Sequence, residues 1–190
     1  MSKKSIGTQG SVWPMPVLIV AAYDEEGKPN LMNAAWGQMC DMDKIALFIS
    51  EGHKTTQNIL KTKAFTVAIS DRAHMVEADY VGIASGNEVE DKFARTGLHQ
   101  TRSEKVNAPL IEEFPLTMEC ELAEVVNTEN MYCIVGKIVD TQVEEYAVGE
   151  DGKVDPSKLD AIAFDEYQSG YYAMGERVGT AWDAGVPLMK

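Results

Sequence analysis

A chain of 190 residues, 45% hydrophobic and 25% charged, is long enough for one domain with a full core, and we expect residues 1–190 to form a single domain. The formal net charge of −13 argues against nucleic acids and anionic membranes as partners. No apolar run approaches the roughly 18 residues of a membrane-spanning helix, and the first residues lack the apolar segment of a secretory signal.

The three cysteines, Cys40, Cys120 and Cys133, are an odd and widely spaced set. Their spacing matches neither a disulfide framework nor a metal-binding pattern such as C-x-x-C. We therefore expect a protein of the reducing cytoplasm that binds no metal ion.

The first third of the chain predicts strands joined by a tight turn. Residues 17–23 are apolar and partly β-branched, which predicts a buried strand after the proline-rich, extended segment 14–16. A strong turn signal over residues 24–30 leads back into a predicted strand over 31–39, so that the two strands form a hairpin. A third strand is expected over residues 44–50.

Two helices are predicted next, with a strand between them. Helical spacing indicates a helix over residues 54–63, where Thr55 or Thr56 can serve as the N-cap. The apolar run 64–70 predicts a fourth strand, and residues 73–83 predict the second helix.

The remaining chain carries two long strand patterns, over residues 116–127 and 131–146. A polar loop is expected over 85–93, irregular structure over 95–112 and a turn at 149–152. Six or more strands, few helices and hairpin connections predict a mainly β protein, built as an antiparallel barrel rather than a parallel sheet.

Lys54, Thr55 and Thr56 place one cation and two hydroxyl groups at the start of the first predicted helix. Unpaired backbone N–H groups at a helix start, together with cations and hydroxyls, suit a phosphate group. The alternative is an ordinary helix cap with a solvated lysine, which is the more common role of such residues at a helix start. The small residues of the preceding strand favour phosphate, and His53 can add a donor if it is protonated.

Asn33, Ala34 and Ala35 form a run of small side chains that lets a flat ligand approach the backbone. Trp36 can pack beside such a ring, although residue type alone favours a tryptophan that fills the core. Ser50 can reach a ribityl chain or simply end its strand. Together with the phosphate site, these features predict a site for flavin mononucleotide (FMN).

Several short segments stand in a fairly specific order and spacing: residues 14–17, 27–37, 53–59, 78–82, 85–86, 91–93 and 171–179. In this arrangement the chain resembles the flavin reductase-like family with an FMN-binding split barrel, and its flavoredoxin-like members in particular. The resemblance covers most of the chain and implies a homodimeric split barrel with FMN near the subunit interface. It also implies electron transfer through the flavin, with a nicotinamide cofactor or a redox protein as electron partner.

Two positions depart from the pattern of the family that the chain resembles. The family often has a proline pair where this chain has Asp41-Met42-Asp43-Lys44, and it often has a histidine near the position of Met131-Tyr132, where none is present. The second departure removes a catalytic donor from that strand. We therefore assign no catalytic residue.

Lys92 is the candidate for redox tuning, because a cation near the flavin N1 favours the anionic reduced flavin. The alternative is a solvated lysine paired with Glu88 across one helical turn. Cys40 can line the pocket or be an inert buried residue, and Phe164 belongs to an aromatic tail that can cover a partner's flavin or fill an interface. The complete set of predicted cofactor-binding residues is Asn30, Met32, Asn33, Ala34, Ala35, Trp36, Cys40, Ser50, His53, Lys54, Thr55, Thr56, Asn58, Lys92 and Phe164.

The sequence thus predicts an FMN-dependent oxidoreductase or electron carrier. The alternative is a split barrel that holds flavin without turnover. A hydrolase that uses Ser50 or Cys40 is a weaker candidate, because His53, His74 and His99 form no recognisable nucleophile–base pattern and no G-x-S-x-G motif occurs. Since no G-x-G-x-x-G fingerprint is present, a nicotinamide would have to bind transiently on the flavin face.

Overall fold

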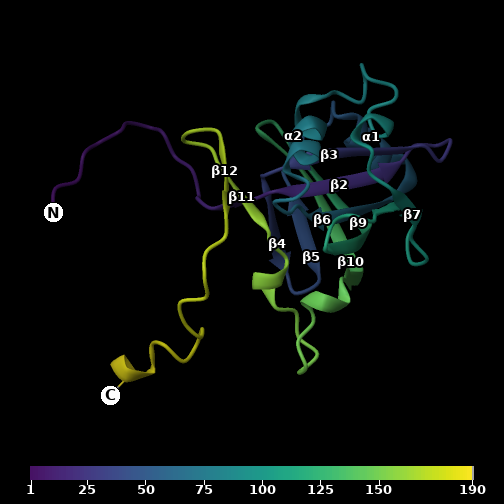
Figure 1. The fold of residues 1–190 in the computed structure, drawn as a ribbon. Coiled ribbons are helices and arrows are strands. Elements are labelled where there is room, and N and C mark those ends of the chain that lie inside the picture. Colours follow the sequence, from purple (N-terminus) through teal and green to yellow (C-terminus); the bar gives the residue numbers. More distant parts are fainter. Residues whose placement is uncertain (190) are drawn as a thin grey trace.

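The computed structural model describes residues 1–189, and its centre is a seven-stranded sheet in which every pairing is antiparallel (Figure 1). The strand order is β3-β2-β6-β9-β10-β5-β4. The strands are β2 (Leu18–Tyr23), β3 (Pro29–Ala34), β4 (Gly37–Asp41), β5 (Lys44–Leu47), β6 (Ala64–Ile69), β9 (Leu116–Thr128) and β10 (Met131–Val143).

The two edge strands of this sheet, β3 and β4, are neighbours in the chain and are joined only by Ala35 and Trp36. The sheet must therefore roll up until its two edges meet, which makes a barrel split along the line between β3 and β4. Gly37 lies at this meeting point, because a Cβ placed on it would collide with Leu18 of β2 and lie 2.9 Å from Leu47 Cδ2 of β5. The mainly β, antiparallel barrel predicted from the sequence is confirmed.

Two α-helices, α1 (Lys54–Thr62) and α2 (Met75–Ile83), pack against the β2–β3 side of the sheet. They are the only α-helices of residues 1–189, and neither is long and apolar enough to cross a membrane. The smaller sheets contain β1 (Met15–Pro16), β11 (Ile162–Asp165) and β12 (Gly170–Ala173), and separately β7 (Gln100–Arg102) and β8 (Pro109–Ile111). Single turns of 3₁₀ helix occur at Ala94–Thr96, Glu145–Ala147, Pro156–Lys158 and Val186–Met189.

Strand β2 is buried on both faces, which explains its uninterrupted apolar sequence. Leu18, Val20 and Ala22 face the barrel interior, where Phe65 of β6 and Ile59 of α1 complete the core. The alternate residues of β2 face a second cluster outside the barrel, made by α2, β8 and β11. Helix α2 and the barrel wall are therefore held together through one strand.

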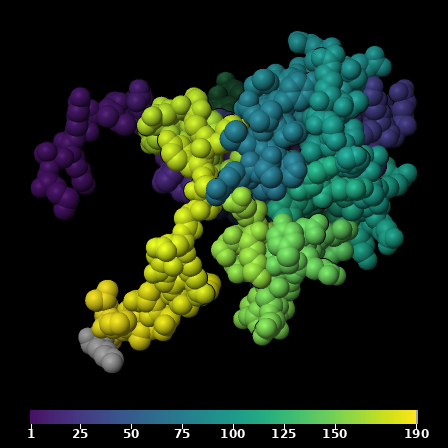
Figure 2. Space-filling model, viewed as in Figure 1, coloured from purple at the N-terminus to yellow at the C-terminus, as the bar shows by residue number. Residues whose placement is uncertain are grey.

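Both ends of the chain leave the barrel on the same side (Figures 1 and 2). The first ten residues and residues 173–189 are exposed along their whole length. They pack against no part of the barrel core.

The structure corrects four local expectations. The strand expected over 31–39 is two strands, because the chain crosses from one sheet edge to the other at Ala35 and Trp36. Residues 95–112 contain the β7–β8 hairpin, and β11 was not anticipated. The N-cap of α1 is His53 rather than either threonine, since the helix already begins at Lys54, two residues earlier than a Thr55 cap requires.

Candidate functional site

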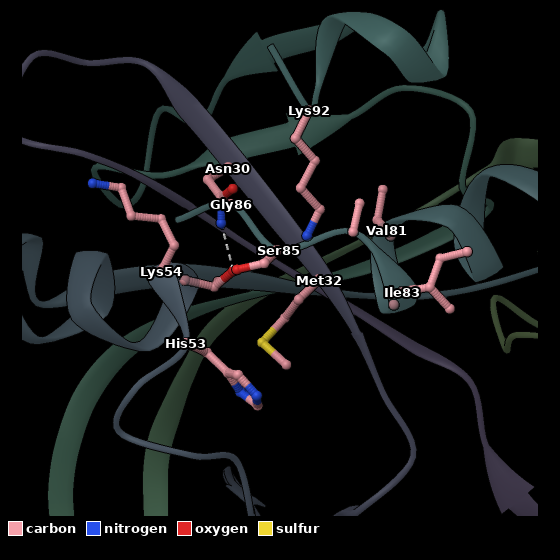
Figure 3. Close-up of a pocket in the computed structure, with 12 residues that line it drawn as sticks. Asn30, Met32, His53, Lys54, Val81, Ile83, Ser85, Gly86 and Lys92 are labelled. Atoms are coloured by element: carbon pink, nitrogen blue, oxygen red, sulfur yellow. Dashed lines mark hydrogen bonds between the residues drawn. The ribbon is translucent and has the colours of Figure 1, made fainter. Parts of the chain in front are cut away.

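A cavity of about 170 Å³ opens between β3, the start of α1 and the end of α2 (Figure 3). We call it the cationic cavity for the charges described below. Its lining consists of Asn30, Met32, His53, Lys54, Thr55, Val81, Gly82, Ile83, Ala84, Ser85, Gly86 and Lys92.

Helix α1 presents an uncapped N-terminus to this cavity. His53 has the extended backbone of an N-cap but makes no side-chain capping hydrogen bond, and the first turn contains no acidic residue. A helix leaves its first backbone N–H groups unpaired, and the helix dipole makes that end favourable for an anion. The start of α1 therefore lacks the acceptor that most helices supply from their own side chains.

Lys92 is the most unusual residue of the cavity, since only 3% of its surface is exposed. Its ammonium group points into the cavity in Figure 3, and no counter-ion or hydrogen bond within residues 1–189 offsets its burial. Burial therefore lowers the pKa of Lys92 to about 8. The expected alternative, a solvated lysine paired with Glu88, is wrong. A buried cation without a partner is costly, so an anion in this cavity would be favoured.

The cavity carries positive charge on an acidic protein. Lys54 and Lys92 line it, and no aspartate or glutamate does, although the whole chain has a net charge of −13. His53 is exposed, but partial desolvation and the nearby Lys92 charge lower its pKa, so that it lines the cavity as a neutral imidazole near pH 7. Lys54 lies at the rim, with its ammonium pointing away from Lys92 and Met32 (Figure 3).

The three walls of the cavity are held close together by a hydrogen bond between β3 and α1 and by a glycine in the loop after α2. The Asn30 side-chain amide donates a hydrogen bond to Thr55 Oγ1 at 2.6 Å, which ties β3 to α1. Gly86 closes this corner, because a Cβ on it would collide with Asn30 Oδ1 and lie 3.1 Å from Lys54 Cβ. A glycine at this position lets the loop after α2 approach the other two elements. Uncapped N–H groups, a buried ammonium and hydroxyl groups in one corner fit a phosphate group.

Six of the predicted cofactor-binding residues line the cationic cavity together: Asn30, Met32, His53, Lys54, Thr55 and Lys92. Nine others do not line it. Thr56 and Asn58 are fully buried in α1, and each has a polar side-chain atom without a hydrogen-bond partner in residues 1–189. Ser50 accepts a hydrogen bond from Gly52 N at 3.2 Å, so it shapes the turn before α1.

The predicted ring-binding residues continue along β3, past the cavity. Asn33 donates to the Ala78 carbonyl at 3.1 Å and so ties β3 to α2, while Ala34 is buried in the barrel core. Ala35 is half-buried, and Trp36 is 52% exposed, so the expectation that Trp36 fills the core is wrong. The reason is that Trp36 lies in the link between the two sheet edges.

Two further predicted residues lie outside the cavity. Cys40 is exposed on β4, so the alternative of an inert buried cysteine is wrong, because β4 is an edge strand. Phe164 on β11 packs against the second core cluster, with its ring centroid 6.0 Å from that of Tyr171.

The predicted cofactor-binding residues include none from one wall of the cavity, residues 81–86, although parts of this wall belong to the segments that carry the family resemblance. These residues end α2 and form the loop behind it, and they meet α1 only in the folded chain. Ser85-Gly86 is the local signal that could have indicated them, since a small, polar pair after a helix allows close approach of the backbone.

Fold and cavity together define a split barrel with a cationic cavity beside its edge strand β3. The chain belongs to the family described as the flavin reductase like domain, whose model matches residues 10–159. The flavoredoxin of Desulfovibrio vulgaris (Miyazaki F) is similar with 37% identity and a TM-score of 0.91, covering 97% of this chain and 100% of that one.

Two further proteins show similarity over most of their length. The crystal structure of flavoredoxin from Methanosarcina acetivorans has 26% identity and a TM-score of 0.89, with 100% of both chains covered. An uncharacterized protein of Aquifex aeolicus is 26% identical over 160 residues, which are 80% of this chain and 81% of that protein.

Proposed function

We propose that this chain binds FMN and passes electrons through it, as an FMN-dependent oxidoreductase of the flavoredoxin type. The observation that carries the proposal is the cationic cavity itself, in which a buried, unpaired lysine and an uncapped helix meet without any carboxylate. Membership of the flavin reductase like domain family supports flavin as the ligand whose phosphate occupies this cavity.

The cavity is large enough for a phosphate and part of the ribityl chain, and the flavin ring would lie further along β3. We therefore propose Lys92 as a phosphate ligand, in place of the expected cation near the flavin N1. A strand rises about 3.3 Å per residue, so Ala34 is about 13 Å from Asn30 along β3. The half-buried Ala35 and the exposed Trp36 follow at the open line of the barrel. Trp36 can pack on the ring, and the small side chains before it allow the ring edge to reach the backbone.

The chemistry that FMN supplies when bound is the transfer of electrons, and the residues of this chain bind and orient it. A nicotinamide cofactor or a redox protein is the proposed electron partner. We also propose a homodimer, because large apolar side chains are exposed around the edge strand β4, among them Trp36, Met39 and Phe48. The three free cysteines fit a reducing compartment, and the cytoplasm is the proposed location.

The test compares FMN with riboflavin, which lacks the phosphate. Replacing Lys92→Met removes the buried charge and keeps a similar volume. Since a hydrogen bond to a charged group is worth about 1.5–3 kcal/mol, FMN affinity should fall roughly tenfold to 150-fold. Riboflavin affinity should stay within about threefold. Titration of each flavin into apoprotein, followed by flavin fluorescence, gives the four dissociation constants.

Lys105→Met is the matched control, because Lys105 is exposed and lies outside the cavity. Equal weakening of both flavins by Lys92→Met would contradict the phosphate assignment. Anaerobic addition of reduced nicotinamides then separates an enzyme from a passive flavin carrier. Bleaching of the flavin absorbance indicates turnover with nicotinamide, whereas bound flavin that no nicotinamide or redox protein reduces indicates a binding module.

A further inference from the structure

A second cavity, of about 250 Å³, adjoins the cationic cavity. The two share Asn30, Lys54, Gly86 and Lys92 as lining residues. The rest of the second cavity is formed by the turn between β2 and β3 and by the loop that follows Gly86. We call it the acidic cavity, because its four carboxylate residues outnumber its three lysines, Lys28, Lys54 and Lys92.

The charges of the acidic cavity are only partly compensated. Glu90 is 3.5 Å from Lys28 Nζ in an ion pair, and the Asp24 carboxylate accepts hydrogen bonds from the backbone N–H groups of Glu26 and Lys28. The side chains of Glu26 and Glu88 are exposed and take part in no hydrogen bond or ion pair described for residues 1–189. Two free carboxylates therefore remain at this end of the site.

The residues of β3 line the two cavities in sequence, which shows on which side of a bound flavin the acidic cavity would lie. Pro29 belongs to the acidic cavity, Asn30 to both cavities and Met32 to the cationic cavity alone. The proposed ring position lies still further along the chain, beyond Ala34. Any group attached to the far side of the phosphate would therefore have to enter the acidic cavity.

We infer that the acidic cavity selects FMN against flavin adenine dinucleotide (FAD), and that Glu26 and Glu88 are the residues that set this specificity. The inference rests on the proposed function. The terminal phosphate of FMN carries close to two negative charges near pH 7, whereas each phosphate of a dinucleotide carries a single charge. FAD thus brings less charge to Lys92, and its second phosphate would enter a cavity in which four carboxylates outnumber three lysines. Salt screens only in part the repulsion between charges that lie closer together than a Debye length of about 8 Å.

The experiment measures the dissociation constants of FMN, FAD and riboflavin for the whole chain, by titration of flavin into apoprotein. The test variant is Glu26→Gln with Glu88→Gln, which removes two charges and keeps the side-chain shapes. The control is Glu145→Gln with Glu150→Gln, an equal change of net charge at exposed residues outside both cavities. Wild-type protein should bind FMN at least about tenfold more tightly than FAD, and the test variant should reduce this ratio by about tenfold. The control should leave the ratio unchanged.

The outcomes separate this inference from the proposed function. If wild-type protein binds FMN and FAD equally well, the acidic cavity does not discriminate between the two flavins and the inference is wrong. An unchanged ratio in the test variant also overturns it, because the selection would then come from shape rather than charge. A chain that binds none of the three flavins would overturn the proposed function, and the inference with it.

Discussion

At the scale of single residues, the burial of Lys92 in the cationic cavity makes the free energy of unfolding depend on pH. The pKa of Lys92 is about 8 in the folded chain, against 10.5 for an ordinary lysine. Between these two values the unfolded chain binds more protons than the folded one, so the stability of the ligand-free protein should rise with pH. A pKa difference of this size corresponds to about 3 kcal/mol at most.

Lys92→Met should therefore stabilise the ligand-free protein at pH 7, by up to about 3 kcal/mol. The advantage should shrink as the pH rises from about 8 to 10.5, because wild-type Lys92 loses its proton there. Urea unfolding of both proteins at several pH values checks this. A Lys92→Met protein less stable than wild type at pH 7 would show that Lys92 has a partner in the ligand-free state.

The same residue predicts how ligand binding depends on pH. The FMN phosphate has lost its second proton above a pH of about 6, so only the protein changes charge in the alkaline range. FMN affinity of the wild type should fall as the pH rises above about 8, while the affinity of Lys92→Met should stay level over the same range. Fluorescence titrations between pH 7 and about 9.5 measure both slopes, and parallel slopes would contradict the assignment.

At the scale of elements, the meeting of the two sheet edges depends on Gly37. A Cβ at this position collides with Leu18 and crowds Leu47, so Gly37→Ala should destabilise the barrel by about 1–3 kcal/mol. Gly10→Ala is the control, because nothing lies within 4 Å of a Cβ there. Urea midpoints of the two variants give the comparison, and equal midpoints would show that the edges are free to move apart.

The sequence predicted those elements whose signals are local. The hairpin of β2 and β3, the strand β6 and the long pair β9 and β10 each show a clear run of apolar residues between turns. The break at Ala35 and Trp36 has no such signal, since it exists because β4 pairs with β5 at the far edge of the sheet. The same limit applies to the site. The segment 53–55 was predicted from its own residues, but residues 81–86 reach it only through tertiary packing.

At the scale of the whole molecule, the exposed apolar side chains around β4 predict association of two copies. Light scattering should give twice the 20.9 kDa of one chain. Met39→Lys with Phe48→Lys should weaken the dimer, since both side chains are exposed in a single chain. Val154→Lys should not, because the exposed Val154 pairs with Val148 in an isolated bridge outside β4. Wild-type protein that scatters as a single chain while holding flavin would rule out the homodimer.

The short link between the sheet edges also has a consequence for the newly made chain. The β2–β3 and β4–β5 hairpins are complete once Leu47 has been synthesised, yet β5 finds its other neighbour only when β10 has been made, up to Val143. At about 5–20 residues per second, a ribosome needs about 5–20 s for the residues between them. Throughout this interval the nascent chain carries an apolar strand with an unpaired edge. Translation speed and access to chaperones therefore affect how much of the chain folds correctly.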